Sequence, residues 1–241
     1  MTIAMVDESK PSAIPTQPAR VAIGAIIIYQ LLLIGLILLR PDLDPSWHTI
    51  SEWAIGPYGW LMSLAFFVSA VSYAALLIAL RSQLGGRLGR AGLFILFLCV
   101  IGAVGVSIFT TDPMPLRPPL SARGTLHVVF GTTQLVLLPF AALLINISLV
   151  TNPAWASARR ALLSTAFVPL CGFMAFVVYS VLFVAPHGPG AYGPGVNIGW
   201  PPRIAFFSYM VWVVTIGWTA TRVEAAPRHE DFIADRAIEG R

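Results

Sequence analysis

Charged residues are scarce in this chain, and their scarcity decides its class. Only 11% of the 241 residues are charged and 57% are hydrophobic, whereas soluble domains carry roughly 25% charged residues. The composition therefore indicates an integral membrane protein whose first partner is the lipid bilayer. A nucleic-acid-binding protein is not expected, because the sequence has no basic patch with interleaved aromatic residues.

Cysteine is equally rare, since Cys99 and Cys171 are the only two, and no disulfide framework is implied. Both fall within apolar runs, where we expect small core residues. The alternation of apolar and polar residues that is typical of an outer-membrane barrel is also missing. The run VAIGAIIIYQLLLIGLILL at 21–39 is instead apolar on every side, and the fold is expected to be α-helical.

Six apolar runs are long enough to cross a membrane as helices, because a hydrocarbon layer about 30 Å thick takes about 20 helical residues. We predict an all-α membrane protein, a six-transmembrane-helix bundle in one domain over residues 20–221, between mobile polar segments at 1–19 and 222–241. The final residues IEGR coincide with a protease recognition sequence, and we assign them no function. The spans are expected at 20–39, 58–80, 91–109, 124–149, 161–185 and 204–221.

Lysine and arginine are distributed unequally between the two sides of this bundle. Four of the 15 fall on one side, namely Arg40, Arg117, Arg123 and Arg203. Because cytoplasmic loops carry an excess of basic residues, both termini are expected in the cytoplasm, and the loops 40–57, 110–123 and 186–203 outside it. The predicted location is the cytoplasmic membrane, with several passes.

The acidic residues and histidines outside the tails all lie on the predicted outer side. They are Asp42, Asp44, His48, Glu52, Asp112, His127 and His187. An ionisable residue within a span is costly and indicates a functional site by default. The asymmetry therefore predicts one polar site at the extracytoplasmic side.

The segment FTTDPMPLRPPLSARGTLH at 109–127 contributes two of these residues. Ser121 is expected to cap the next helix, with His127 about a turn and a half inside it and Gln134 on the same face. We expect Asp112 and His127 to face the bundle interior, where a neutral imidazole suits metal or proton chemistry. The structural alternative is that His127 hydrogen-bonds Asp112 or a loop carbonyl and pins the hairpin.

The stretch WHTISEWAIGPYGW at 47–60 leads into the second span. Helical spacing would place His48, Ser51 and Glu52 on one face of a short interfacial helix, whose aromatic residues suit the headgroup level. The alternative is an anchoring helix whose polar face meets water.

The stretch HGPGAYGPGVNIGWPPR at 187–203 is too rich in glycine and proline for regular structure. It forms either a lid over the outer site, with His187 and Arg203 near its ends, or a surface loop. Those two residues are the weakest candidates for the site.

Two of these motifs resemble the pattern of a known family. In the domain-of-unknown-function 998 family of prokaryotic six-helix membrane proteins, a His-x-x-Ser-Glu stretch precedes the second span, and an F-x-x-D turn is followed by a G-x-x-H helix start. The resemblance covers roughly residues 20–221. It is carried by His48, Ser51, Glu52, Phe109, Asp112, Gly124 and His127. The family has no established activity, so the resemblance implies an architecture and a site position rather than a reaction.

Three functions are compatible with these residues. The candidate catalytic residues are His48, Ser51, Glu52, Asp112 and His127. In a metal-dependent hydrolase acting on a lipid or headgroup, His48, Asp112 and His127 would bind a divalent metal such as zinc, with Glu52 as general base. The alternatives are a one-sided protein that binds, senses or transports a lipid or small-molecule ligand from the outer side, and a structural or assembly partner. No haem is expected, because His127 is the only clear histidine within a span.

Overall fold

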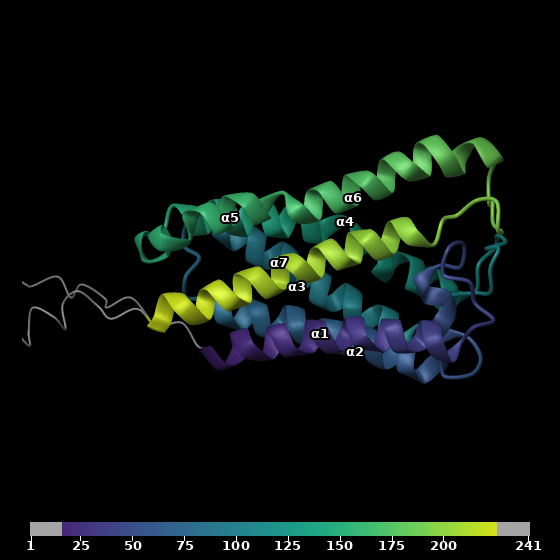
Figure 1. The fold of residues 1–241 in the computed structure, drawn as a ribbon, viewed down its shortest axis with the longest axis horizontal. Coiled ribbons are helices and arrows are strands. Elements are labelled where there is room, and N and C mark those ends of the chain that lie inside the picture. The colour runs from purple at the N-terminus through teal and green to yellow at the C-terminus, as the bar shows by residue number, and fades with distance from the viewer. Residues whose placement is uncertain (1–15, 226–241) are drawn as a thin grey trace, which may run out of the picture.

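The structure, a computed structural model, describes residues 16–225, and these form a bundle of long helices (Figure 1). The helices are α1 (Thr16–Leu39), α2 (Gly59–Leu80), α3 (Gly86–Ile108), α4 (Ala122–Val150), α5 (Arg159–Ala166), α6 (Val168–Tyr179) and α7 (Trp200–Ala225). Shorter turns of 3-10 or π type are η1 (Ile50–Ala54), η2 (Pro153–Ala158), η3 (Ser180–Val184) and η4 (Ala185–His187). Residues 16–225 contain no β-strand, which confirms the all-α prediction. Most of the predicted tails, and the terminal IEGR, lie outside the described residues.

Six helical segments of the described chain are long and apolar enough to cross a membrane, which confirms the predicted six-helix membrane protein. They are Thr16–Leu39, Gly59–Leu80, Gly86–Ile108, Ala122–Val150, Pro153–His187 and Trp200–Val223. The last begins before the predicted position 204, with Pro201 and Pro202 in its first turn, where the missing N–H costs nothing. The prediction that 187–203 lacks regular structure was therefore wrong for its last four residues.

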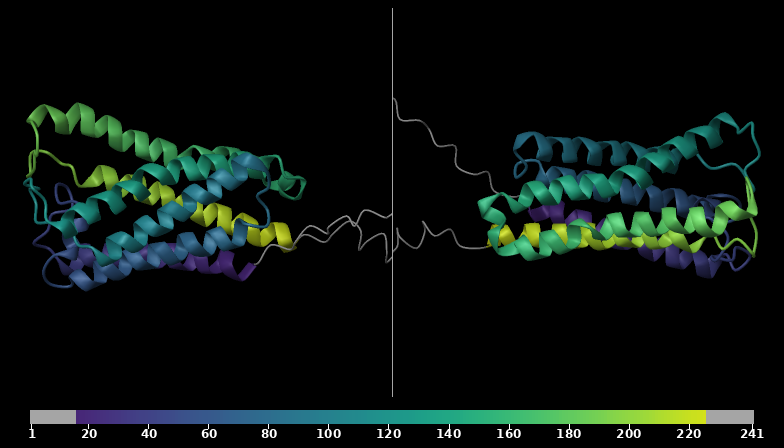
Figure 2. Two further views of the ribbon diagram at one scale, coloured as in Figure 1. Left: turned by 180° about the vertical axis from the view of Figure 1, so that it is seen from behind. Right: turned by 90° about the horizontal axis from the view of Figure 1, so that it is seen from above.

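The helices pack in chain order into a closed ring. Each of α1 to α4 contacts the next, α4 contacts α5 and α6, α6 contacts α7, and α7 returns to α1. The N-terminal end of α1 and the C-terminal end of α7 lie at the same end of the bundle (Figures 1 and 2). The opposite end, which carries the segments 40–58, 109–121 and 188–199, is called the site end below.

Glycine brings α3 and α4 close together near the site end. A Cβ atom at Gly102 would lie 2.8 Å from the carbonyl oxygen of Phe130, and one at Gly105 would lie 2.1 Å from the Phe130 ring. Small residues allow this approach between membrane helices, where packing replaces the hydrophobic driving force. The first half of α4 is thereby held against α3.

The fifth crossing segment is interrupted at Phe167, between α5 and α6. Pro169 occupies the first turn of α6. It has no N–H to donate to the carbonyl of Thr165, and its ring would crowd that carbonyl in a continuous helix. The segment therefore crosses as two helices rather than one.

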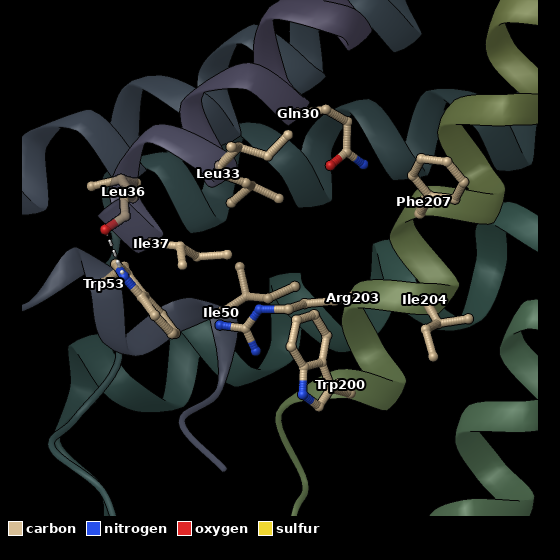
Figure 3. A pocket seen from close by; sticks show the side chains of 11 residues that line it. Gln30, Leu33, Leu36, Ile37, Ile50, Trp53, Trp200, Arg203, Ile204 and Phe207 are labelled. Atoms are coloured by element: carbon tan, nitrogen blue, oxygen red, sulfur yellow. Dashed lines mark hydrogen bonds between the residues drawn. The ribbon is translucent and has the colours of Figure 1, made fainter. Parts of the chain in front are cut away.

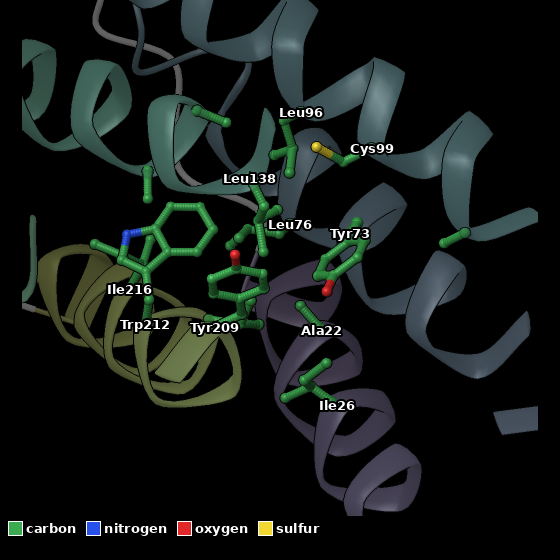
Figure 4. Packing of buried hydrophobic residues seen from close by; sticks show 14 of the residues in the cluster. Ala22, Ile26, Tyr73, Leu76, Leu96, Cys99, Leu138, Tyr209, Trp212 and Ile216 are labelled. Carbon is green, nitrogen blue, oxygen red and sulfur yellow. The ribbon is translucent and has the colours of Figure 1, made fainter. Parts of the chain in front are cut away.

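Tyr209 and Trp212 of α7 lie in the buried core (Figure 4), and their polar atoms have partners in α4. The Tyr209 hydroxyl donates to a carbonyl of α4 at 2.7 Å, and the Trp212 indole N–H donates to the Asn146 side chain at 2.9 Å. Unpaired polar groups are costly in apolar surroundings, so these bonds fix α7 against α4. Cys99 is buried in this core as predicted, but Cys171 is exposed, so the core prediction was wrong for Cys171.

Candidate functional site: a serine–histidine pair at the site end

His127 connects three segments at the site end. Ser121 is the N-cap of α4, as predicted, because its Oγ accepts the Gly124 N–H at 2.9 Å. His127 follows inside the helix and is only 5% exposed. Its Nδ1 lies 2.6 Å from the carbonyl oxygen of Phe109, and its Nε2 lies 2.9 Å from Oγ of Ser51.

The partners of the two ring nitrogens determine where the protons of His127 lie. A carbonyl oxygen can only accept, so Nδ1 carries the proton and donates to Phe109. In the neutral ring, Nε2 is then an acceptor, and the Ser51 hydroxyl donates to it. A serine hydroxyl, an imidazole and an orienting acceptor stand in this order in hydrolase triads, where a carboxylate takes the place of the Phe109 carbonyl.

Ser51 is presented by η1, the 3-10 turn that precedes α2. The turn is closed by Glu52, whose Oε1 accepts the Thr49 N–H at 2.5 Å and the Thr49 hydroxyl at 3.0 Å. The predicted short helix between 47 and 60 is therefore present, but it begins at Ile50 and leaves His48 outside. His48 therefore lies outside the helix whose face it was predicted to share with Ser51 and Glu52, although Tyr192 contacts both His48 and Glu52.

A cavity of about 350 Å³ lies beside the pair, and both Ser51 and His127 line it. Gln134, two turns beyond His127 on α4, also lines this cavity. It is only 3% exposed. Ile50 lines both this cavity and a second one between α1 and α7. The apolar walls include Phe66, Val106, Leu135, Phe176 and Phe206. A few polar groups in a mainly apolar chamber are typical of sites for small ligands.

Asp112 contacts the start of α4 and not His127. Its Oδ2 accepts the Ser121 N–H at 2.8 Å and its Oδ1 accepts the Ser121 hydroxyl at 2.5 Å, and these bonds lower the pKa of Asp112. Gly124 leaves room for the carboxylate, because a Cβ atom there would lie 2.4 Å from Asp112 Cγ. The F-x-x-D and G-x-x-H motifs thus meet in one feature, called the hairpin cap below, in which Asp112 accepts from Ser121 and Gly124 leaves room for the carboxylate.

Glu52 and His48 also have partners away from the cavity. Glu52 is buried and accepts the Tyr192 hydroxyl through Oε2. The pKa of Tyr192 is raised, mainly by burial and to a smaller extent by this hydrogen bond. The His48 ring lies against Trp47 with centroids 3.6 Å apart, and its Nδ1 is 3.0 Å from the carbonyl oxygen of Asp44.

The proposed zinc ligands are not brought together. Within residues 16–225, no three His, Cys, Asp or Glu side chains are grouped so that they could hold a metal ion. His48, Asp112 and His127 each have a separate set of contacts. Of the five candidate site residues, Ser51 and His127 are the two that a side-chain hydrogen bond joins, while Glu52 closes η1 and accepts the Tyr192 hydroxyl.

The two weakest candidates lie in different surroundings. His187 is exposed, and its Nδ1 lies 2.8 Å from the carbonyl oxygen of Phe183 in the preceding turn η3. Arg203 Nη1 donates to the carbonyl oxygens of Pro45, His48 and Gly199 at 3.1, 2.8 and 2.7 Å. Arg203 therefore ties the start of α7 to the segment before η1.

Two participants were not identified from the sequence: Tyr192, and Phe109 as the source of the carbonyl partner that the hairpin-pinning alternative expected for His127. A backbone carbonyl leaves no trace in the sequence, because every residue has one. The only signal for Tyr192 is that it is the one tyrosine in a loop rich in glycine and proline.

Comparison with known proteins places this chain in a family. No curated protein and no solved structure matches the chain. A sequence model of the family described as "Protein of unknown function (DUF998)" matches residues 22–219, a range that includes Ser51, Asp112 and His127. The chain is therefore a member of the DUF998 family.

Proposed function

We propose that the protein is a membrane-embedded hydrolase of acyl esters in which Ser51 is the nucleophile and His127 the general base. The observation that carries this proposal is the 2.9 Å contact between Ser51 Oγ and His127 Nε2, with the opposite ring nitrogen held at 2.6 Å by the Phe109 carbonyl. A nucleophile in contact with a base that is oriented by a third group is the usual signature of covalent catalysis.

In the proposed reaction, Ser51 Oγ attacks the carbonyl carbon of the ester and its proton passes to His127 Nε2. The bond to the leaving alcohol breaks, and the alcohol oxygen takes that proton. Water then attacks the acyl group on Ser51, gives a proton to Nε2, and this proton returns to Ser51 Oγ as the carboxylic acid departs. The sum is ester plus water to acid plus alcohol, and the Phe109 carbonyl stabilises the imidazolium that forms twice.

Gln134 is the side chain that we assign to the developing oxyanion. It lines the cavity on the same face of α4 as His127, and its amide can donate to a carbonyl oxygen. Preorganised donors of this kind contribute about 10²–10³ in rate when their removal is tested in hydrolases.

An amphipathic lipid is the substrate class that fits the position of the cavity. The pair lies at the end of membrane-spanning helices, and the cavity walls are mainly apolar. The excess of basic residues at the opposite end supports an extracytoplasmic position of the site in the cytoplasmic membrane. The proposal replaces the metal-dependent hydrolase with a hydrolase that uses a serine nucleophile, because the hypothetical ligands do not converge.

Covalent labelling of the purified protein by a fluorophosphonate tests the proposal, together with hydrolysis of a medium-chain p-nitrophenyl ester. Labelling is expected at Ser51, lost in Ser51→Ala and slowed about 10²–10⁴-fold in His127→Ala. Ser107→Ala is the matched control, because Ser107 Oγ donates only to a carbonyl of its own helix. No labelling of Ser51 in folded protein, with both variants merely less stable, would show that the pair only pins the hairpin. Reversible ester binding without turnover would favour a one-sided binding protein.

A further inference from the structure

A second cavity, of about 380 Å³, lies between α1, η1 and α7 (Figure 3). Ser51 and His127 do not line it, and its walls are apolar apart from two side chains, Arg203 and Gln30. The remaining lining residues are Leu33, Ile34, Leu36, Ile37, Ile50, Trp53, Trp200, Ile204 and Phe207. An apolar chamber with two polar groups is a candidate for a ligand site distinct from the first.

Arg203 brings a positive charge into this cavity, and no carboxylate of the described residues lies within ion-pair distance of it, although the buried Glu52 interacts with it electrostatically at longer range. Within the described residues, the ion pair found is that of Arg40 with Asp42. Nη1 of Arg203 donates to three carbonyl oxygens, and the guanidinium carbon lies 4.4 Å from the centre of the Trp53 ring. No hydrogen bond joins Nε or Nη2 to another described residue. A guanidinium in apolar surroundings is costly unless it is paired, so the site favours an anion.

Gln30 supplies an independent observation. Its Nε2 atom is buried and has no hydrogen-bond partner among the described residues. Figure 3 shows its amide directed toward the space between α1 and α7. A buried donor without an acceptor is costly in a membrane interior, and an acceptor oxygen on a ligand would satisfy it.

The cavity opens sideways, where lipid surrounds the bundle. Ile34, Ile204 and Phe207 line it, and each is more than half exposed. Gln30 lies nine residues before the end of α1, or about 14 Å along the helix. The opening thus extends from the polar end of the bundle into the depth that acyl chains occupy.

We propose that this cavity binds a lipid with one acyl chain and an anionic head, a carboxylate or a phosphate. The head pairs with Nε and Nη2 of Arg203, the chain lies between α1 and α7, and an ester carbonyl, where the lipid has one, accepts from Gln30. The assignment does not depend on the proposed hydrolase activity, because Ser51 and His127 are not part of this cavity.

The test places the protein in phosphatidylcholine nanodiscs and labels it with a photoactivatable dodecanoate, whose crosslinks are mapped by mass spectrometry. Crosslinks are expected at residues 30–37 and 200–207. Dodecanoate and 1-dodecanoyl-lysophosphatidate should compete at least tenfold better than neutral dodecanol. Crosslinks spread evenly over the six helices, or equal competition by dodecanol, would overturn the proposal.

Variants separate the role of each polar group. Arg203→Gln should remove the preference for anionic competitors, whereas Arg222→Gln should preserve it, because Arg222 stacks on Trp218 at 4.8 Å toward the other end of α7. Gln30→Leu should weaken the ester-bearing lysophosphatidate about tenfold and leave dodecanoate unchanged, which distinguishes the two sources of the anionic head. An unchanged preference in Arg203→Gln would contradict the assignment.

Two further variants keep the test decisive if Arg203→Gln does not fold. Ile204→Trp narrows the opening while it retains Arg203, and it should reduce crosslinking by the probe about tenfold. Ser51→Ala should bind all probes as the unsubstituted protein does. Loss of binding in Ser51→Ala would place the lipid in the first cavity and overturn the proposal for the second.

Discussion

Nε2 of His127 and Oγ of Ser51 lie 2.9 Å apart although the two residues are 76 positions apart in the chain. The contact joins α4 to the turn before α2, and the ring of Phe66 in α2 meets the His127 ring edge with centroids 6.2 Å apart. The pair therefore exists only when the helices have closed into their ring. Its geometry reports on the whole bundle and not on one helix.

Ser51→Ala and His127→Ala should have non-additive effects on ester hydrolysis. If the two residues act as one catalytic unit, the double variant loses no more activity than the more damaging single variant, about 10²–10⁴-fold. The measurement is the rate of p-nitrophenyl ester hydrolysis by the purified single and double variants. Multiplication of the two separate losses would show that the residues act independently.

Gly124→Ala should destabilise the protein by about 1–3 kcal/mol, the usual cost of overpacking. The added methyl group would lie 2.4 Å from Asp112 Cγ, so the hairpin cap must shift. Thermal unfolding in detergent measures the loss.

Gly131→Ala provides the matched control on the same helix, because its nearest neighbour would be a Val106 methyl group at 3.5 Å. A stability close to that of the unsubstituted protein is expected for it. The double variant Gly124→Ala, Asp112→Ala should be less damaged than the sum of its single changes. Additive losses would mean that Asp112 is not what Gly124 accommodates.

The stabilising effect of Asp112 should depend on pH. The hydrogen bonds from Ser121 lower its pKa in the folded state, so ionised Asp112 favours folding above the ordinary aspartate pKa of about 3.9. The stability difference between the unsubstituted protein and Asp112→Asn should be fully present at neutral pH and shrink as the pH falls through the folded-state pKa. Unfolding temperatures measured from pH 3 to pH 7 check this, and a difference that grows toward acid pH would refute it.

Tyr192→Phe should release the loop 188–199 from η1. The lost hydrogen bond is the one donated to Glu52. The phenol is already protonated at neutral pH because the ordinary tyrosine pKa is about 10, and its pKa is raised further here by burial and by the contact with Glu52. Backbone amides of the loop should exchange with deuterium about tenfold faster. Tyr58→Phe is the control at the same end, because Tyr58 is 47% exposed. Unchanged exchange in Tyr192→Phe would show that other contacts hold the loop.

The sequence was most informative where a single physical rule governs a segment. Apolar length predicted all six crossing helices, because the thickness of the hydrocarbon layer is fixed. Ser121 was predicted as the N-cap, because capping involves residues only three positions apart. The start of α7 was missed, since proline was interpreted as a boundary although the first helical turn tolerates it.

The grouping of the site residues could not be predicted by the same means. His48, Ser51 and Glu52 were assigned to one face on α-helical spacing, but η1 begins at Ile50 and is a 3-10 turn. The partner of His127 was sought in Asp112 or in a loop carbonyl. The carbonyl of Phe109 does contact one ring nitrogen, but tertiary packing brings Ser51 to the other. Spacing along a helix does not indicate which loops meet across a bundle. Every residue has a backbone carbonyl, so the residue types could not single out the carbonyl of Phe109 as a partner.

Ile50 is 5% exposed and forms a wall of both cavities. One side chain thus lines both the chamber of the reactive pair and the chamber of Arg203, and Ser51 is its immediate neighbour in the chain. A lipid that presses on Ile50 from one chamber would alter the volume left to a substrate in the other. A change of the Ile50 rotamer would then couple the two ligands without any movement of the helices.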